Sequence, residues 1–242
     1  MADLYEDALV AFRSGDNDLA RQLSERALEA ARSTHTAAAE TDALCMLSRV
    51  ALRDGEIGLV QKLAEEGRAV ARASGEERLE RMPLHMQAVA ARMNGDHSLA
   101  RRLYEESIEL NRRLGEERMV AAELHNLAYV ELHDGQPIRA KELFAKARHE
   151  ARRLGYEGLR PYLLGDAAVI AAEEGDADRA ARLYGAAQAA FGATGQVPDP
   201  DDAAEQERLR ARVAAVLGNE GFRAACDVGA RLTFEEAVGD RL

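Results

Sequence analysis

The sequence predicts an all-α fold: a right-handed superhelix (α-solenoid) of five helix pairs with a helical C-terminal cap. Two observations lead to this prediction. The 242-residue chain is rich in alanine, which loses no side-chain entropy in a helix. In addition, a glycine recurs every 40 residues and is followed by similar segments: GDNDLARQL, GEIGLVQKL, GDHSLARRL, GQPIRAKEL and GDADRAARL. A fixed period without insertions indicates that one supersecondary unit is repeated along the chain.

Each repeat unit is expected to hold two antiparallel helices separated by a glycine. A second glycine series, with members such as Gly75 and Gly115, ends the units, and His35 stands in its first slot. Glycine has no Cβ, so it stops a helix in the left-handed conformation at the lowest cost. The predicted units span residues 1–35, 36–75, 76–115, 116–155 and 156–195.

Columns of equivalent residues predict how the units pack. The second helices carry a leucine column beginning at Leu23 and Leu63, with a column of mostly small residues four positions later. One helix pair is too thin to bury its own apolar face, so neighbouring pairs are expected to stack. Pro83 and Pro161 fall early in two first helices, which therefore either start late or are kinked.

The segment 196–242 departs from the period and is expected to consist of a linker and capping helices. Residues 196–200, Gln-Val-Pro-Asp-Pro, form a helix-breaking link. A charged helix is predicted over 201–217 and a shorter one over 219–230. Thr233 and Glu236 have the spacing of a capping box that opens a last turn. We expect this tail to cover the open end of the last repeat.

The spacing of large and small residues resembles the tetratricopeptide repeat (TPR). Unit three carries the pattern at Leu84, Ala88, Ala100, Tyr104 and Ser107, and units four and five keep the same spacing. Leucine replaces the usual tryptophan, the tyrosine seven residues later is mostly alanine, and arginine replaces the closing proline. Each unit is also six residues longer than the usual 34. The resemblance is therefore to a long-helix variant, and it implies a fold without specifying a function.

The C-terminal sequence resembles the closing region of bacterial LuxR-type ATP-dependent transcriptional regulators. The similarity lies in Leu217-Gly218, Phe222, Ala224-Ala225, Gly229-Ala230-Arg231 and the run LTFEEA at 232–237, with Cys226 where those proteins usually have tryptophan. It implies a role in a bacterial regulatory system. The chain has no phosphate-binding loop motif and no obvious helix-turn-helix module. It is therefore interpreted as a stand-alone repeat protein or a fragment of such a regulator.

Composition limits the classes of partner and the compartment. The net charge of −11 argues against general nucleic-acid binding and against an anionic membrane surface. No apolar stretch is long enough to span a bilayer. Two cysteines cannot build a disulfide framework, which favours a reducing, cytoplasmic environment. The excess of arginine over lysine is consistent with a bacterial origin.

Basic and aromatic residues recur at the positions that would line the concave groove. In TPR proteins the first helices line this groove. A carboxylate, a phosphate or an acidic peptide is expected to meet the arginines there, because guanidinium groups bind such anions in bidentate geometry. The alternative is a solvated polar face. The predicted groove residues are Arg49, Arg53, His85, Arg92, His125, Tyr129 and His133.

An apolar stripe marks the first helix. Tyr5, Leu9 and Phe12 lie on one face of it, and no preceding repeat covers that face. The stripe is either part of the core of unit one or a surface for a partner or a second copy of the chain. Self-association as a homodimer is therefore one hypothesis.

No arrangement predicts catalysis or metal binding. His85 and His125 occupy equivalent positions in successive units, but no third metal ligand is evident. Cys45 is interpreted as a small apolar residue, because a nucleophile needs an adjacent base and His85 lies one repeat away. The acid pairs Glu173–Glu174 and Asp201–Asp202 are interpreted as a solvated helix end and a loop.

We therefore predict a non-enzymatic module without a cofactor or a metal. It would bind a protein or peptide partner, or sense a small-molecule ligand, in its groove. The alternative is a plain scaffold or a self-associating protein.

Overall fold

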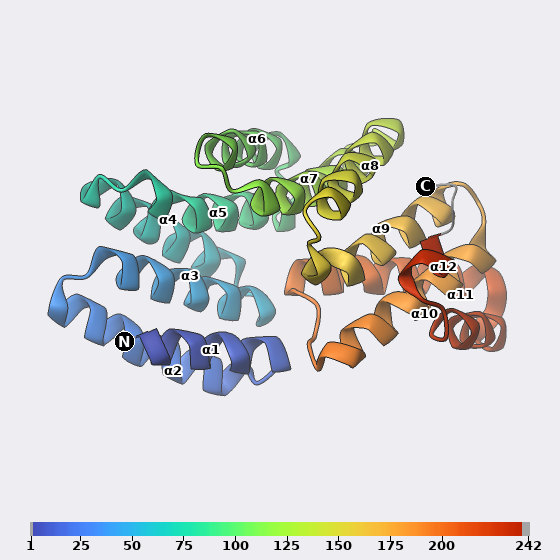
Figure 1. Cartoon of the computed structure of the whole chain (residues 1–242), viewed down its shortest axis with the longest axis horizontal. Coiled ribbons are helices and arrows are strands. Elements are labelled where there is room, and N and C mark those ends of the chain that lie inside the picture. Colours follow the sequence, from blue (N-terminus) through green and yellow to red (C-terminus); the bar gives the residue numbers. More distant parts are fainter. Residues whose placement is uncertain (1, 239–242) are drawn as a thin grey trace. The chain divides into compact units, whose positions relative to one another are not determined.

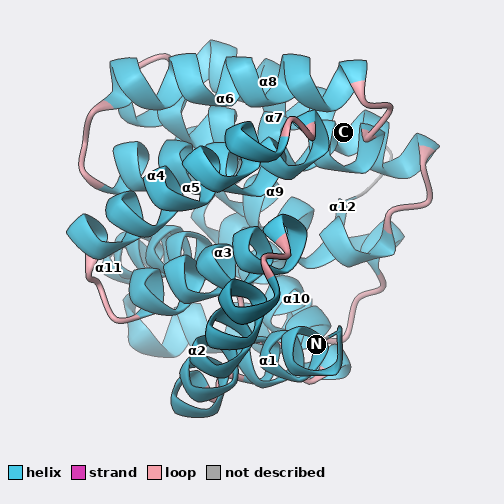
Figure 2. Ribbon diagram, turned by 90° about the vertical axis from the view of Figure 1, so that its left-hand side faces the viewer, coloured by secondary structure: helices cyan, strands magenta, loops and turns pink. Residues whose placement is uncertain are grey.

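A computed structural model describes residues 2–238 (Figure 1). Within these residues the chain forms helices joined by short loops, as Figure 2 shows, and contains no strand. It divides into two compact units, which we describe separately. The first unit comprises the residues up to Glu116 together with Asp199–Asp201. The second comprises Glu117–Pro198 together with the residues from Asp202 onward.

The first unit contains three helix pairs that pack in succession. Its helices are α1 (Ala2–Ser14), α2 (Asn17–Thr34), α3 (Ala37–Arg53), α4 (Ile57–Ser74), α5 (Arg81–Met93) and α6 (His97–Arg113). Leu23 and Leu63, which open the predicted leucine column, are partly buried here. Residues at other equivalent positions of the repeats have no exposed surface: Leu44 and Leu84 in first helices, and Ala20, Val60 and Ala100 in second helices. These small residues let neighbouring helices approach closely while the leucines fill the space between them.

The second unit contains two helix pairs and the C-terminal helices. They are α7 (Glu117–His133), α8 (Pro137–Arg153), α9 (Arg160–Glu173), α10 (Ala177–Thr194), α11 (Pro200–Gly229, of which residues from Asp202 onward belong here) and α12 (Phe234–Val238). Residues 196–199 are not helical, whereas Pro200, which was predicted to belong to the link, begins α11. Gly218 interrupts α11 with φ 71° and ψ 162°. Thr233 and Glu236 form the predicted reciprocal capping box at the start of α12.

Aspartate and glycine residues that recur along the chain lie at the ends of the helices. Asp16, Asp96 and Asp176 each accept a hydrogen bond from the backbone N–H three residues later, as N-cap residues do. At the opposite end of α2, His35 takes the left-handed conformation, with φ 54° and ψ 40°. This is the slot that glycine fills in the other units, and among the described residues His35 is the only non-glycine with positive φ.

The two prolines delay their helices. A 3-10 turn at Glu77–Glu80 precedes α5, and another at Glu157–Leu159 precedes α9. Pro83 and Pro161 consequently lie in the first turn of the α-helices, where a missing N–H removes no helical hydrogen bond. Of the two alternatives, a late start is the one that the structure shows.

The second half of α11 packs closely against α10. A Cβ atom at Gly185 would overlap the carbonyl oxygen of Cys226, and one at Gly229 would overlap that of Arg182. Tyr184 and Phe222 lie across the same contact, with ring centroids 5.5 Å apart. The close approach of the two backbones therefore depends on glycine at both positions.

These features confirm the predicted fold class, an all-α solenoid of helix pairs. No helix in the described part of the chain combines the length and apolar character needed to cross a bilayer.

Candidate binding groove

In the first unit, two predicted groove arginines contact acidic residues of the chain itself. Arg92 on α5 forms an ion pair with Asp201, and the side chains are only 1% and 7% exposed. Arg49 on α3 donates to Asp199 at 2.7 Å and is more exposed, at 19% of its side chain. Asp199 and Asp201 of this chain therefore contact two arginines that were predicted to bind an acidic ligand.

The apolar stripe of α1 lies largely within the core of the first unit. Phe12 is 1% exposed and packs in a cluster that includes Met46. The guanidinium carbons of Arg49 and Arg53 lie 4.5 and 3.7 Å from the centre of the Phe12 ring, a cation–π arrangement. Arg53 also donates to the backbone oxygen of Phe12 at 2.7 Å.

Tyr5 and Leu9 are half-buried against the same cluster. Phe12 thus has almost no surface to offer a second copy of the chain, which corrects the view of it as part of an uncovered face. Self-association through the two remaining residues stays a prediction.

In the first unit, the surroundings of Cys45 and His85 do not favour nucleophilic catalysis or metal binding. Cys45 is buried, and burial raises the pKa of its thiol far above the usual range. His85 stacks edge-on against Tyr104, with ring centroids 6.4 Å apart. Among the described residues, no three histidine, cysteine or carboxylate side chains gather closely enough to hold a metal ion.

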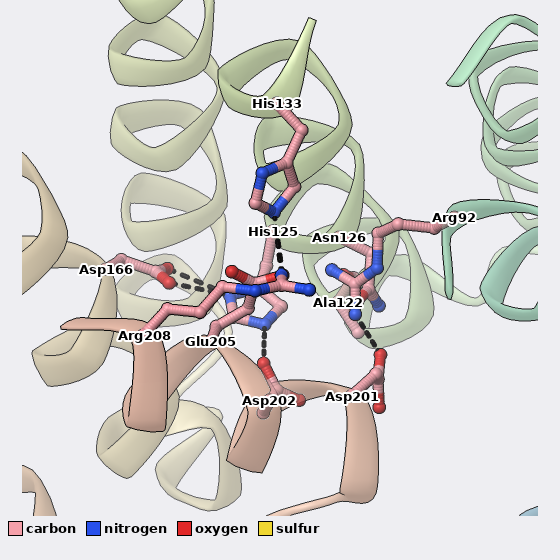
Figure 3. Close-up of polar contacts among 10 residues, drawn as sticks. All are labelled: Arg92, Ala122, His125, Asn126, His133, Asp166, Asp201, Asp202, Glu205 and Arg208. Carbon is pink, nitrogen blue, oxygen red and sulfur yellow. Dashed lines mark hydrogen bonds and ion pairs between the residues drawn. The ribbon is translucent and has the colours of Figure 1, made fainter. Parts of the chain in front are cut away.

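In the second unit, His125 is buried between two carboxylates (Figure 3). Its Nδ1 lies 2.9 Å from Asp166 on α9, and its Nε2 lies 2.9 Å from Asp202 on α11. Both ring nitrogens face carboxylate oxygens, an arrangement that a doubly protonated imidazolium satisfies when both carboxylates are ionised. Burial alone lowers the pKa of His125, but the two carboxylates outweigh it and raise the pKa well above its usual value.

Aromatic rings enclose this charged group. Tyr129, one turn after His125 on α7, and Tyr162 on α9 lie edge-on to the imidazole, with centroids 5.3 and 5.8 Å away. Phe144 on α8 stacks edge-on against Tyr129 at 5.0 Å. Tyr129 is 3% exposed, so it supports the wall of the groove and presents little surface to a ligand.

His133, two turns further along α7, contacts the next turn of α11. Its Nε2 lies 2.8 Å from Glu205, which also accepts from Nη1 of Arg208 at 2.9 Å (Figure 3). Glu205 is buried, whereas the side chain of Arg208 is 59% exposed. One turn later, Arg212 pairs with Glu173 and donates to the backbone oxygen of Ala172 at 3.0 Å.

These helices enclose a hollow of about 480 Å³ in the second unit. One of its lining residues, His133, is among the groove residues that the sequence predicted, and α11 supplies the opposite wall. The floor is apolar and the rim carries charges of both signs. The lining consists of Leu132, His133, Gly135, Pro137, Val169, Ala172, Glu173, Glu205, Arg208, Leu209 and Arg212.

Asp201 and Asp202, the acidic residues that follow the link, do not lie where we predicted them. Asp201 and Asp202 are 5% and 7% exposed, so the expectation of a solvated loop is wrong. Asp201 forms a buried ion pair with Arg92, and Asp202 is one of the two carboxylates that contact the buried imidazole of His125. A signal was present, since Asp202, Glu205, Leu209 and Val213 recur at helical spacing and are all buried.

No protein-family model and no curated protein matches this chain. Solved structures of TPR-like repeat proteins do match, which shows that the fold is TPR-like.

Three of these structures are similar over most of the chain. A Rap protein complexed with competence and sporulation factor has a TM-score of 0.68 and 16% identity, covering 97% of this chain and 72% of that one. BtubC (BKLC) from P. vanneervenii has a TM-score of 0.60 and 20% identity, covering 87% and 88%. A crystal structure of nearly identical TPR-like repeats of a kinesin light chain from Podosopora anserina has a TM-score of 0.53 and 20% identity, covering 89% and 95%.

Proposed function

We propose that this chain is a non-enzymatic protein-interaction module whose second unit binds a peptide segment of a partner protein. The observation that carries the proposal is the hollow between α7, α9 and α11, with its apolar floor and charged rim. Apolar hollows that carry a few placed polar groups are the usual form of a recognition site. The TPR-like structures of similar fold support an interaction role, and one of them is a complex with competence and sporulation factor.

The lining indicates the chemistry of the peptide. Leu132, Val169 and Leu209 offer apolar surface to one or two aliphatic side chains. Arg208 stands at the rim with most of its side chain exposed, although Nη1 contacts Glu205. Its remaining donors are available to a carboxylate, because a guanidinium carries five N–H groups. We therefore infer a peptide that combines an aliphatic residue with a nearby acidic side chain or C-terminal carboxylate.

The regulatory part of the proposal rests on sequence alone. The C-terminal residues resemble those of bacterial LuxR-type regulators, and none of the three similar structures is described as such a protein. In a bacterial cytoplasmic regulator of this kind, a peptide or small ligand in the hollow would change how the chain contacts its target. The ligand would have to bind the two states with different affinity.

A peptide selection tests the binding role. Peptides selected on the full chain from a random display library would be measured by fluorescence anisotropy. Arg208→Glu, which reverses the rim charge, is expected to weaken their binding about tenfold, the effect of losing one charge-assisted hydrogen bond. Arg210→Glu is the matched control, since Arg210 is an exposed arginine of the same helix that pairs with Glu207 outside the lining.

Some outcomes of the peptide selection would overturn the proposal. If no peptide is enriched, or if the enriched peptides bind wild type and Arg208→Glu equally, the hollow is not the peptide site. Enriched peptides without acidic groups would contradict the inferred ligand chemistry.

A further inference from the structure

A second hollow lies on α8, in the second unit, and is lined by three arginines, a histidine and an alanine. Its volume is about 530 Å³, and its lining consists of Ala145, Arg148, His149, Arg152 and Arg153. It shares no residue with the hollow proposed to bind a peptide. No carboxylate contributes to this lining, although the chain as a whole carries a net charge of −11.

Two of these arginines have no ion-pair partner in the part of the chain that the structure describes. Arg153 pairs with Glu117 at 2.5 Å and with Glu150 at 2.7 Å, so its charge is compensated. For Arg148 and Arg152, by contrast, no carboxylate of the described residues lies within ion-pair distance, and Asp166, whose charge acts on Arg148, makes its closest contacts with His125.

The burial of Arg148 separates this cluster from an ordinary solvated arginine surface. The residue is only 8% exposed and still lines the hollow. Burial lowers the pKa of its guanidinium, and the negative charge of Asp166 offsets this only in part. A nearly buried cation without an ion pair is costly, and an anion in the hollow would remove that cost.

The spacing on α8 points to the kind of anion. Arg148 and Arg152 are four residues apart and therefore lie on one face of the helix, with His149 beside them. Two uncompensated positive charges favour a dianion over a monocarboxylate, and the planar guanidinium matches the geometry of phosphate oxygens. The volume of the hollow also leaves room for an organic group attached to the phosphate.

We propose that the hollow lined by Arg148, His149 and Arg152 binds the phosphoryl group of a small phosphate monoester. Such a ligand would contact α8 without occupying the peptide hollow. The proposal is therefore independent of the proposed function, and either one can fail alone.

Calorimetric titration of the full chain tests this site. The probes are inorganic phosphate and glycerol 2-phosphate, with acetate at equal ionic strength as the monoanion control. Saturable binding of both phosphates, with weaker or no binding of acetate, is the expected result. Equal binding of acetate and phosphate, or no saturable binding of either phosphate, would overturn the proposal.

Variants on α8 assign the binding to these residues. Arg152→Gln removes one exposed guanidinium and is expected to raise the dissociation constant for glycerol 2-phosphate about tenfold. Lys146→Gln removes one exposed charge from the same helix outside the lining and is expected to change the constant less than about twofold.

Arg148→Gln should abolish binding, and circular dichroism with thermal unfolding will show whether this variant remains folded. Because Arg152 is exposed, its variant gives the decisive result even if Arg148→Gln does not fold. Equal losses of affinity for glycerol 2-phosphate in Arg152→Gln and Lys146→Gln would show that binding depends only on net charge. That result would overturn the assignment of the site to α8.

Discussion

The imidazole Nε2 of His125 lies 2.9 Å from a carboxylate oxygen of Asp202, although 77 residues separate the two in the chain. Asp166 contacts the other ring nitrogen at the same distance. The proton on this buried group thus joins α7 to α9 and to the first turns of α11 within the second unit. The stability of that unit should consequently depend on pH.

We expect the free energy of unfolding to fall as the pH rises above about 6.5, the pKa of an unperturbed histidine. The folded-state pKa of His125 is raised, so its contribution is fully present below the unfolded-state pKa and is lost as the pH rises through the folded-state value. Urea unfolding at a series of pH values measures this. His125→Asn should flatten the dependence in that window, whereas His149→Asn, an exposed histidine, should retain it.

An identical pH dependence in wild type and His125→Asn would show that the buried imidazole does not carry the proton.

The ion pair of Arg92 and Asp201 should stabilise the first unit. Both side chains are nearly inaccessible, so replacing one partner removes an ion pair that is shielded from solvent while the other charge stays buried. Arg92→Met is expected to cost about 3–5 kcal/mol, and Arg92→Met with Asp201→Leu should cost less than the sum of the two single changes. Thermal and chemical unfolding of the four proteins gives the coupling. Arg113→Met, which breaks the exposed pair with Glu77, is the control and should have a much smaller effect.

Strict additivity of the Arg92 and Asp201 changes would contradict this interpretation. It would mean that neither side chain depends on the other for compensation of its charge.

The contact between α10 and the second half of α11 requires glycine at position 185. Gly185→Ala introduces a Cβ that overlaps the backbone of Cys226, and we expect a loss of about 1–3 kcal/mol in the free energy of unfolding. Gly192→Ala is the matched control on α10, because a Cβ added there would have no neighbouring atom within 4 Å. That change should stabilise the chain by about 0.5–1 kcal/mol, since alanine favours the helix. Equal changes in the free energy of unfolding for Gly185→Ala and Gly192→Ala would show that α10 and α11 do not approach closely at Gly185.

His35 is expected to be a locally strained position. It holds the left-handed conformation that costs a residue with a side chain about 1–2 kcal/mol. His35→Gly should therefore raise the free energy of unfolding by up to about 1 kcal/mol, partly offset by the greater freedom of glycine in the unfolded chain. The reciprocal change Gly75→His should destabilise α4 by a similar amount. A loss of stability in His35→Gly would mean that the imidazole makes a compensating contact.

Much of the fold could be predicted because its determinants act over short distances in the sequence. The glycine at position 75 ends α4 by its own backbone freedom, and Asp96 caps α6 by accepting from an N–H three residues away. Leu44 and Leu84 pack between neighbouring helices of a regular period. Each of these effects needs only a local pattern and the adjacent repeat.

The candidate site could be predicted in part. The predicted groove residue His133 does line a hollow, because helical periodicity assigns residues to one face. The acidic residues that meet the groove cations were not recognised as partners, since a run of aspartates after two prolines has the composition of a solvated loop. Phe12 was left with two interpretations because the sequence does not show that Arg49 and Arg53 cover its ring.

The sequence by itself therefore determined the all-α class, the succession of helix pairs and the glycines between them, because helix capping and nearest-neighbour packing depend on short, periodic separations. Only the tertiary structure decided which charges meet. Arg92 and Asp201 are 109 residues apart, and their pairing depends on the path that the chain takes after the non-helical residues 196–199. Charge attraction is not directional enough to specify that path from composition, whereas burial of both groups makes the pairing obligatory once the chain has folded.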